Sequence, residues 1–477
     1  MRDLVGEDIE EVGRYNYGFY FVYRKIFRQY GLDRILSRIA RRKKLRFNLS
    51  DAVMLMLIQR LNLPTSKREN FHLQNEYLGP DEVQIQHLYR SLDHLAENQQ
   101  LVQNCIYQSG RDLFNQKLDV VFYDVTTFYF DSDKIIEGSL RQKGFSKDGK
   151  VGKTQILFGL LIDRFKQPIG YRIYRGDTFE GHTFEQALDS LRDHYNIDKV
   201  IVVADRGMLS KANLKLTTGR GYEFIVGERL KQLPQKVQEG LLDKTRYGKE
   251  WVMHPNTEDP VVVRYHVTEY EGRTIIGTYN PKRAKKDQAE REGRIEKAKA
   301  LLENPSRLKA KARRFIINTE QGKVELNEER IKKAERYDGL LAISTNATKL
   351  EVDQVLEHYR NLYQIEHSFR TFKTHLETRP MFHWTDKRIE GHICLCYIAY
   401  TLLNRLQLTL QKKGVNFSEK TIRKTLERMQ MSLIKQGKKE FYLRSKVTEE
   451  AATLLNKVGK KPPPALFPKS QITNYLQ

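Results

Sequence analysis

The chain has 477 residues, of which 39% are hydrophobic, and it carries a formal net charge of +23 with a pI near 9.6. This length gives room for roughly two to four domains, and so large an excess of cations predicts a polyanionic partner. The three cysteines exclude a disulfide framework, and no run reaches the ~20 apolar residues that span a bilayer. Because the N-terminus is polar and acidic, unlike a signal peptide, we expect a cytoplasmic protein that makes no membrane contact.

Residues 1–117 are predicted to form a mostly helical domain. Ser50 and Asp51 precede a run of apolar residues, as helix caps do, and a basic cluster lies just ahead of them at residues 41–44. Two interpretations are open for this region: it binds DNA, or it is a helical packing domain with a solvated basic face. The sequence contains no clear helix-turn-helix pattern, so no recognition helix is assigned.

Residues 118–227 alternate between strand-like and helix-like segments, which predicts an α/β fold. A run of β-branched and aromatic residues, 118–127, contains Asp124, and an aliphatic run, 199–204, stops just before Asp205. A buried carboxylate is costly without a cation or several hydrogen-bond donors, so Asp124 needs such partners. Each Asp taken alone is also consistent with a turn or a helix cap.

The other elements of this region are short. Strands are expected at residues 155–162, 168–175 and 222–226, and helices at residues 181–192 and 209–216. A glycine-rich loop ahead of these strands carries Lys147, Lys150 and Lys153. The loop either grips phosphate or is a flexible turn with solvated lysines.

Residues 228–346 are too many for a single loop and are predicted to form a β-rich insertion domain. Strand-like runs occur at residues 250–253, 261–268 and 274–278. Residues 281–314 are predicted to be helical and strongly basic, either as a DNA-binding surface or as a solvated helix. Trp251 lies in the first strand-like run, where a core or hairpin role is favoured over stacking on a DNA base.

Residues 359–373 contain neither Pro nor Gly and are predicted to form one continuous helix. Tyr359, Glu366 and Lys373 are spaced by seven residues, so they fall on one face with a drift of about 20° per step. Arg370 lies one turn after Glu366, on approximately the same face. The flanking apolar positions are Ile365, Phe369 and Phe372.

The remainder of the chain is predicted to be helical. Residues 347–412 are expected to complete the α/β region, with an apolar helix at residues 391–410 packed behind the helix that carries Glu366. Residues 413–477 are expected to form a basic helical tail that ends in an extended segment around residues 460–464.

Three carboxylates, Asp124, Asp205 and Glu366, are thus expected from two strands and one helix. Such a set can hold two divalent ions ~3.5–4 Å apart, which activate a water or a 3′-hydroxyl and stabilise the leaving oxygen of a phosphodiester. Carboxylate oxygens favour Mg²⁺ or Mn²⁺ over zinc.

Several blocks of the sequence resemble the DDE transposases of bacterial insertion sequences, in the branch that carries a Tyr-Arg-Glu-Lys signature. The blocks are residues 123–127, 144–148, 155–160, 204–207, 338–346 and 359–373. The resemblance covers most of the chain from about residue 118 to about residue 403. It implies a ribonuclease H-like core interrupted by a β-rich insertion domain. It also implies that Asp124, Asp205 and Glu366 are the metal-binding triad and that the cofactor is a pair of Mg²⁺ ions, with Mn²⁺ as a substitute.

One position departs from this signature, which expects Arg three residues after its Tyr, where the chain has Leu362. Arg370 and Arg360 are therefore the candidates for that contact with DNA. The remaining candidate DNA-binding residues are Tyr359, Lys373, Arg206, Lys147 and Lys153.

The resemblance implies an enzyme that binds the terminal inverted repeats of an element in double-stranded DNA, cuts at the element ends, and joins the freed 3′-hydroxyl to target DNA. Because two ends must be brought together, a homodimer is expected. Two alternatives are open: a catalytically inactive copy that binds ends or regulates, and a nuclease on the same fold.

Overall fold

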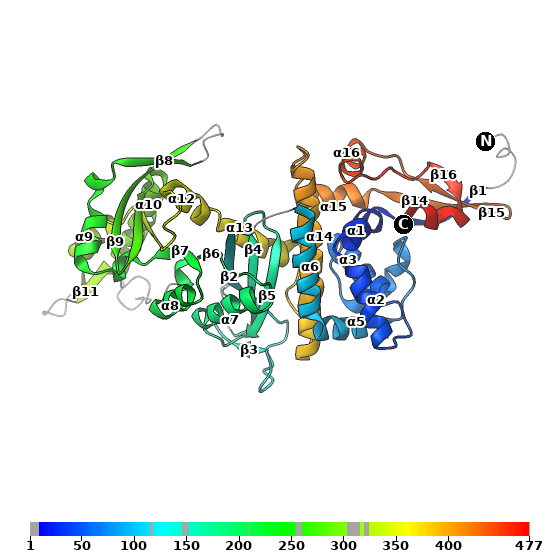
Figure 1. Ribbon diagram of the computed structural model, residues 1–477, viewed down its shortest axis with the longest axis horizontal. Helices are drawn as coiled ribbons and strands as arrows, with labels where there is room; N and C mark the ends of the chain where they lie inside the picture. Colours follow the sequence, from blue (N-terminus) through cyan, green and yellow to red (C-terminus); the bar gives the residue numbers. More distant parts are fainter. Residues whose placement is uncertain are drawn as a thin grey trace. The chain divides into compact units, whose positions relative to one another are not determined.

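The structure is a computed structural model that describes residues 9–114, 118–145, 149, 152–208, 210–253, 260–302, 315–318 and 324–476. The chain divides into two compact units, whose elements are labelled in Figure 1. Unit 1 combines Met1–Asp198 with Tyr363–Gln477, and unit 2 is Lys199–Leu362. Unit 2 is therefore inserted, in sequence, within unit 1.

The N-terminal part of unit 1 is helical, as predicted. Its helices are α1 (Gly18–Gln29), α2 (Leu32–Arg42), α3 (Leu49–Asn62), α4 (Lys67–His72), α5 (Ile85–Glu97) and α6 (Gln99–Phe114). They pack around the apolar helix α14 (Asp386–Gln411), which contacts α1, α3, α5 and α6. Figure 1 shows α6 and α14 running side by side.

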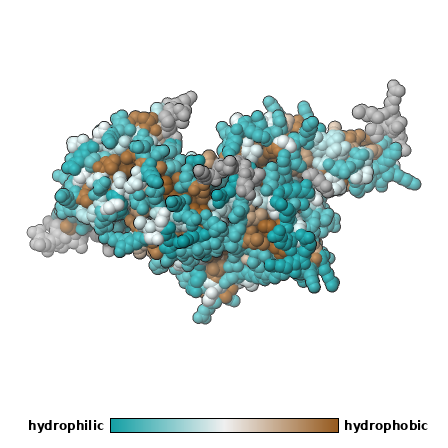
Figure 2. Space-filling view, in the orientation of Figure 1, coloured by the Kyte–Doolittle hydropathy of each residue, from teal (hydrophilic) through white to brown (hydrophobic). Residues whose placement is uncertain are grey.

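Helix α14 is, by length and composition alone, apolar enough to cross a membrane. Its most apolar stretch is 89% buried inside the protein, as in the core helix of a globular domain. Over most of the face shown in Figure 2, the described surface is hydrophilic, with small hydrophobic patches. The cytoplasmic location expected from the sequence stays a prediction.

An antiparallel sheet in unit 1 carries the first candidate carboxylate. Its strands are β2 (Val120–Tyr129), β3 (Gln142–Lys143), β4 (Thr154–Asp163) and β5 (Pro168–Arg175), with β4 paired to the other three. Helix α7 (Glu180–Asp193) covers one face, where the Tyr123 hydroxyl donates to Thr183 at 2.8 Å. Helix α13 (Tyr363–Arg370) and a π-helical turn, η7 (Thr371–His375), lie on the other face.

The two ends of the chain meet in a second, four-stranded antiparallel sheet of unit 1, with the order β1-β14-β15-β16. The strands are β1 (Ile9–Asn16), β14 (Gln430–Gln436), β15 (Lys439–Arg444) and β16 (Leu466–Pro468), and the neighbouring helices are α15 (Glu419–Glu427), α16 (Glu449–Lys457) and α17 (Ile472–Leu476). The expectation of a helical tail is therefore wrong for β14, β15 and β16, whereas α15, α16 and α17 are helical as expected. Met431 and Leu433 are buried and alternate with less buried residues, which is the period of a strand. Gly437 and Lys438 form a two-residue hairpin turn.

Unit 2 contains a mixed sheet with the strand order β6-β7-β13-β10-β9-β8. Its strands are β6 (Ile201–Ala204), β7 (Glu223–Glu228), β8 (Lys249–Met253), β9 (Val261–Tyr270), β10 (Arg273–Tyr279) and β13 (Leu340–Thr345). Only the β6–β7 pair is parallel among these. Its other elements are α8 (Lys211–Gly219), α9 (Gln235–Leu242), α10 (Pro281–Leu302), α11 (Glu328–Glu335), α12 (Val352–Arg360) and a small β11 (Ile316–Asn318)–β12 (Val324–Leu326) hairpin.

The α/β class and most elements expected between residues 118 and 302 are confirmed. The strands expected in the insertion share one sheet with β6 and β7, because β13 pairs with both β7 and β10. The basic helix is confirmed as far as Leu302, and the rest of the expected stretch lies outside the described residues. The domain boundaries drawn from the sequence stay predictions.

We predict that Gly391→Ala destabilises unit 1 by about 1–3 kcal/mol, since overpacking costs this much. A Cβ at residue 391 would lie 2.6 Å from the carbonyl carbon of Leu92 on α5, so the two helix backbones would have to separate. The measurement is urea unfolding of the purified protein. The matched control is Gly110→Ala on α6, where the nearest atom is 4.0 Å away; it should be neutral or stabilise by about 0.5–1 kcal/mol. Equal effects at the two positions would contradict the close contact.

Candidate active site

Asp124 lies in the middle of β2 and is half-buried between buried neighbours. Side chains alternate across a strand, so Asp124 shares the sheet face of Thr126 and Phe128. Phe128 contacts Phe372 of η7, with ring centroids 6.3 Å apart. Asp124 therefore faces the side of the sheet on which α13 and η7 pack. One of its carboxylate oxygens accepts a hydrogen bond from the backbone amide of Val125 at 2.7 Å.

Helix α13 presents Glu366 from this same side of the sheet. The flanking residues Ile365, Phe369 and Phe372 are buried, and the rings of Phe369 and Phe372 lie 6.4 Å and 5.1 Å from that of Phe158 on β4. The buried aromatic rings anchor the helix, whereas Glu366 is exposed. Unit 1 thus supplies two of the three predicted carboxylates from two elements in contact with each other.

The predicted continuous helix over residues 359–373 is wrong. Helix α12 ends at Arg360, a turn follows at Asn361 and Leu362, and α13 begins at Tyr363. Asn361 caps α12 because its backbone amide donates to the Glu357 carbonyl at 3.0 Å and its side-chain amide donates to the Glu357 carboxylate at 3.2 Å.

A second irregularity lies between Glu366 and Lys373. The hydroxyls of Thr371 and Thr374 donate to the carbonyls of His367 and Arg370, at 3.2 Å and 2.5 Å. Such back-bonding distorts a helix, and residues 371–375 form a π-helical turn. The stripe of Tyr359, Glu366 and Lys373 at steps of seven is therefore not a single helical face. Tyr359 belongs to unit 2, whereas the other two belong to unit 1.

In unit 2, Asp205 follows directly after β6 and is exposed, as is Arg206. Strands β6 and β7 are parallel, with Ala204 opposite Val226, so residues after both strands lie at one sheet edge. A Cβ on Gly227 would meet the Tyr359 hydroxyl and would lie 3.2 Å from the Arg206 backbone nitrogen. The glycine therefore lets Tyr359 and Arg206 approach the strand end beside Asp205.

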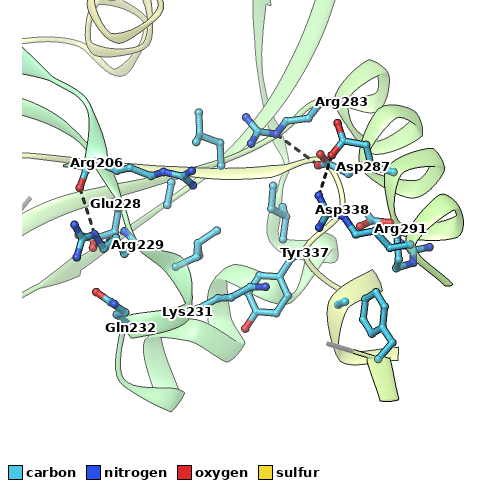
Figure 3. A pocket seen from close by; sticks show the side chains of 18 residues that line it. Arg206, Glu228, Arg229, Lys231, Gln232, Arg283, Asp287, Arg291, Tyr337 and Asp338 are labelled. Atoms are coloured by element: carbon cyan, nitrogen blue, oxygen red, sulfur yellow. Dashed lines mark hydrogen bonds and ion pairs between the residues drawn. The ribbon is translucent and has the colours of Figure 1, made fainter. Parts of the chain in front are cut away.

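A cavity of about 640 Å³ opens in unit 2 next to this edge. Figure 3 shows Arg206 and Arg229 on one side of the cavity, with Arg283 and Asp287 on α10 across from them. The Arg229 guanidinium donates to the Arg206 carbonyl at 3.3 Å. Among the residues that the structure describes, neither Arg206 nor Arg229 takes part in an ion pair.

The acids around this cavity each have a cationic partner. Glu228 is buried and pairs with Arg273 at 2.9 Å. The other pairs are Asp287 with Arg283, Glu290 with Arg294, and Asp338 with Arg291. With its acids neutralised in this way, the cavity presents a net positive surface that suits an anion.

The remaining candidate DNA-binding residues differ in their surroundings. Arg370 is exposed on α13, and Lys373 is half-buried in η7. Arg360 pairs with Glu357 at 3.2 Å. Lys153 pairs with Asp133 at 3.0 Å and donates to the Asp131 carbonyl at 2.8 Å, which ties down the start of β4. Lys147 lies outside the described residues.

The carboxylates present suit a hard divalent ion. Asp205 and Glu366 are exposed, and neither is neutralised by an ion pair within the described part of the chain. Their oxygens, with those of half-buried Asp124, are the ligands that Mg²⁺ and Mn²⁺ prefer. No group of three or more His, Cys, Asp and Glu side chains that could hold a metal is formed by the described residues. The third carboxylate belongs to a different unit from the other two.

Sequence reasoning overlooked Arg229 and Lys231. A usable signal was present, because these residues follow the strand at residues 223–228 just as Asp205 and Arg206 follow the preceding strand. Two parallel strands place such residues at one edge.

Three comparisons relate the chain to known proteins. A sequence model of the family described as "Transposase DDE domain" matches residues 115–402. No curated protein matches the sequence. Among solved structures, the piggyBac transposase synaptic complex with hairpin DNA is similar at 10% identity and a TM-score of 0.40, over 86% of this chain and 78% of that chain. The Mos1 transposase paired-end complex with the left transposon end is similar at 12% identity and a TM-score of 0.17, over 36% and 57%.

We predict that Gly227→Ala destabilises unit 2 by about 1–3 kcal/mol, because the new Cβ overlaps the Tyr359 hydroxyl. In the background of Tyr359→Ala, which removes the overlapping group, the same change should cost less. The coupling is measured by urea unfolding of both single variants and the double variant. Strictly additive effects would show that Tyr359 does not lie against Gly227.

Proposed function

Because the chain belongs to the transposase DDE domain family, we propose that it binds the inverted repeats of an insertion sequence, cuts the DNA at the element ends, and joins the freed 3′-hydroxyl to target DNA. The observation that carries this proposal is the placement of Asp124 and Glu366 on one face of the unit 1 sheet, together with Asp205 after β6. We assign the chain to the branch with the Tyr-Arg-Glu-Lys signature, to which Tyr359, Glu366 and Lys373 correspond.

The order of strands supports a ribonuclease H-like core. Strands β2, β4 and β5 are antiparallel, and the parallel pair β6 and β7 follows them in the chain. Strand β2 carries Asp124, and Asp205 comes directly after β6. A core of this kind presents strand-borne carboxylates to a helix that carries the third acid.

The chemistry consists of two substitutions at phosphorus. In the first, water attacks the phosphodiester at the element end, and the P–O bond to the 3′-oxygen breaks to release a 3′-hydroxyl. In the second, that hydroxyl attacks a target phosphodiester, so that one P–O bond forms and one breaks. Asp124, Asp205 and Glu366 would hold two Mg²⁺ ions, or Mn²⁺ in their place. When bound, such ions lower the pKa of the attacking hydroxyl or water and stabilise the leaving oxygen.

The cations around these acids would position the DNA. Arg370, one turn after Glu366, is the better placed substitute for the signature Arg that Leu362 replaces, because Arg360 is paired with Glu357. Lys373 and Tyr359 would hold phosphate oxygens near the cut. Arg206 and Arg229, which form no ion pair in the described part of the chain, would take a neighbouring phosphate.

The partner is double-stranded DNA, and the net charge of +23 supplies a long-range attraction to it. Joining two element ends in one reaction requires two active sites, so we propose a homodimer in the paired-end complex.

We predict that Glu366→Gln abolishes metal-dependent cleavage but leaves binding to element ends intact. The neutral amide is a poor ligand for Mg²⁺, so the loss should exceed the ~10–100-fold that changes outside the ligand shell cost. Cleavage of labelled DNA with the flanking inverted repeats is measured with and without Mg²⁺ or Mn²⁺. The control is Glu185→Gln, which changes an exposed acid on α7 of the same unit.

Three outcomes separate the alternatives. Cuts at the element boundary that vanish in Glu366→Gln and persist in Glu185→Gln support the transposase. Binding without cutting in the unaltered protein indicates an inactive or regulatory copy. Metal-dependent cutting that ignores the ends indicates a nuclease.

We also predict that Arg206→Gln and Arg229→Gln each weaken binding to all duplex sequences alike. Each lost phosphate contact should reduce the slope of log affinity against log salt concentration by about one. The measurement is a salt titration of DNA affinity. Arg246→Gln, which removes an exposed Arg paired with Asp243 at 3.2 Å in the same unit, should leave the slope unchanged.

A further inference from the structure

A different cleft, of about 510 Å³, lies in unit 1, and its lining includes none of the three carboxylates of the candidate active site. It is formed by the end of α3, the start of α4 and the segment between η7 and α14. Met381, in that segment, forms a parallel bridge with Phe130, six residues after Asp124 in the chain. At about 3.3 Å per residue, the bridge lies roughly 20 Å along the strand from Asp124.

Cations dominate the lining of this cleft. Arg60, Lys67, Arg379 and Arg388 face a single carboxylate, Glu377. Arg60 and Lys67 are 6% and 3% exposed. Arg60 donates to the backbone carbonyl of Leu376 at 3.1 Å, which orients its guanidinium without neutralising it. Arg388 forms an ion pair with Asp93 at 3.5 Å.

Lys67 is buried beside another cation, Arg60. Its ammonium donates to the Asn70 side chain at 2.9 Å, and within the described part of the chain it has no acidic partner. Burial and the nearby Arg60 lower the pKa of Lys67 to about 7. A buried cation is stabilised by an anion that enters the same space.

Two aromatic side chains at the cleft remain exposed, Phe382 by 66% and Trp384 by 48%. Trp384 is nevertheless held in place, because the Arg141 guanidinium lies 4.5 Å from its ring centroid and 4.5 Å from that of Phe130. Arg141 is 1% exposed and donates to the Ser132 carbonyl at 2.8 Å.

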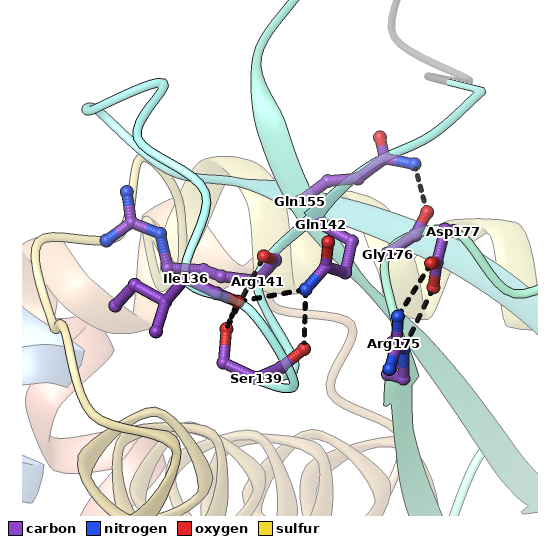
Figure 4. A network of polar contacts seen from close by, with 8 residues as sticks. All are labelled: Ile136, Ser139, Arg141, Gln142, Gln155, Arg175, Gly176 and Asp177. Carbon is purple, nitrogen blue, oxygen red and sulfur yellow. Dashed lines mark hydrogen bonds and ion pairs between the residues drawn. The ribbon is translucent and has the colours of Figure 1, made fainter.

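The loop that carries Arg141 is itself fixed by hydrogen bonds. Figure 4 shows the Gln142 side chain donating to the Ile136 and Ser139 carbonyls, both at 3.0 Å. The Ser139 hydroxyl donates to the Ile136 carbonyl at 2.8 Å. A rigid support beneath an exposed tryptophan is the arrangement that stacks an aromatic ligand at little entropic cost.

We propose that this cleft binds an unpaired nucleotide of DNA, with its phosphate among Arg60, Lys67 and Arg388 and its base stacked on Trp384 or Phe382. The inference deepens the proposed function, on which the choice of DNA rests. It assigns to unit 1 a contact with single-stranded DNA about 20 Å from Asp124 along β2. A free nucleoside monophosphate presents the same phosphate and base, so the test separates the two sources.

The experiment uses the fluorescence of Trp384 in the full-length chain. The protein contains two tryptophans, so Trp251→Phe leaves Trp384 as the only reporter. Without divalent metal, the variant is titrated with a short oligothymidylate, with the same strand carrying an abasic position at each residue, and with thymidine monophosphate. We expect the oligothymidylate to quench Trp384 and the abasic strand to leave it unquenched.

Two further changes test the cleft itself. Phe382→Ala and Arg388→Gln should each weaken binding of the oligothymidylate by at least about fivefold, the lower end of what one stacked base contributes. The matched controls are Phe179→Ala, which removes a ring exposed by 67% elsewhere in unit 1, and Arg164→Gln, which removes an exposed Arg paired with Asp119. Both controls should bind as the parent does.

The outcomes distinguish this inference from the proposed function. Quenching by thymidine monophosphate as strong as that by the oligonucleotide assigns the cleft to free nucleotides. Unchanged Trp384 emission in a protein that still binds duplex element ends overturns the cleft assignment and leaves the transposase proposal standing. Quenching of Trp384 in a protein that does not bind duplex element ends supports the cleft assignment and contradicts the transposase proposal. Quenching that survives both cleft variants also overturns the assignment.

Discussion

The burial of helix α14 is the constraint on which the rest of unit 1 depends. Its residues are buried on every side, from Ile389 to Leu410 with few exceptions, so each neighbouring element must supply a complementary surface. Tyr397 meets Tyr171 of β5 with ring centroids 4.8 Å apart, and Tyr400 stacks on Phe372 at 4.8 Å. The N-terminal helices, the sheet with Asp124 and the turn with Lys373 thus share one core. At Gly391 the approach is so close that helix α5 leaves no room for a side chain.

The same packing explains how the two carboxylates of unit 1 are held. Phe372 contacts α14 through Tyr400 and the sheet through Phe128 and Phe158. One side chain therefore links η7, which directly follows the helix that carries Glu366, to the strand that carries Asp124. Apolar neighbours determine the position of the backbone around each acid. Of the two, the Glu366 carboxylate is exposed.

The sequence was sufficient to predict the elements that depend on a local pattern of apolar residues. The strands around Asp124 and before Asp205 are recognisable from their apolar runs, and both residues stand where expected.

The break at Asn361 was missed because Asn within a helical pattern does not by itself end a helix. Whether the helix ends there depends on how the following turn packs against the rest of the protein, which the local sequence does not show. The strands of residues 430–444 were missed for a similar reason. Their charged composition hides a two-residue period, and β14 is stabilised by β1, which lies more than four hundred positions earlier in the chain.

That long-range pairing has a consequence for biosynthesis. Asn16 pairs with Gln430, so the two partners are 414 positions apart in the chain. At a ribosomal rate of about 5–20 residues per second, β1 waits roughly 20–80 s for its partner strand to be made. Until then the backbone donors and acceptors of residues 9–16 lack their β14 partners, and unpaired strand edges are surfaces on which chains associate wrongly. Charged side chains oppose such association, and Glu10, Glu11 and Arg14 place such charges on β1.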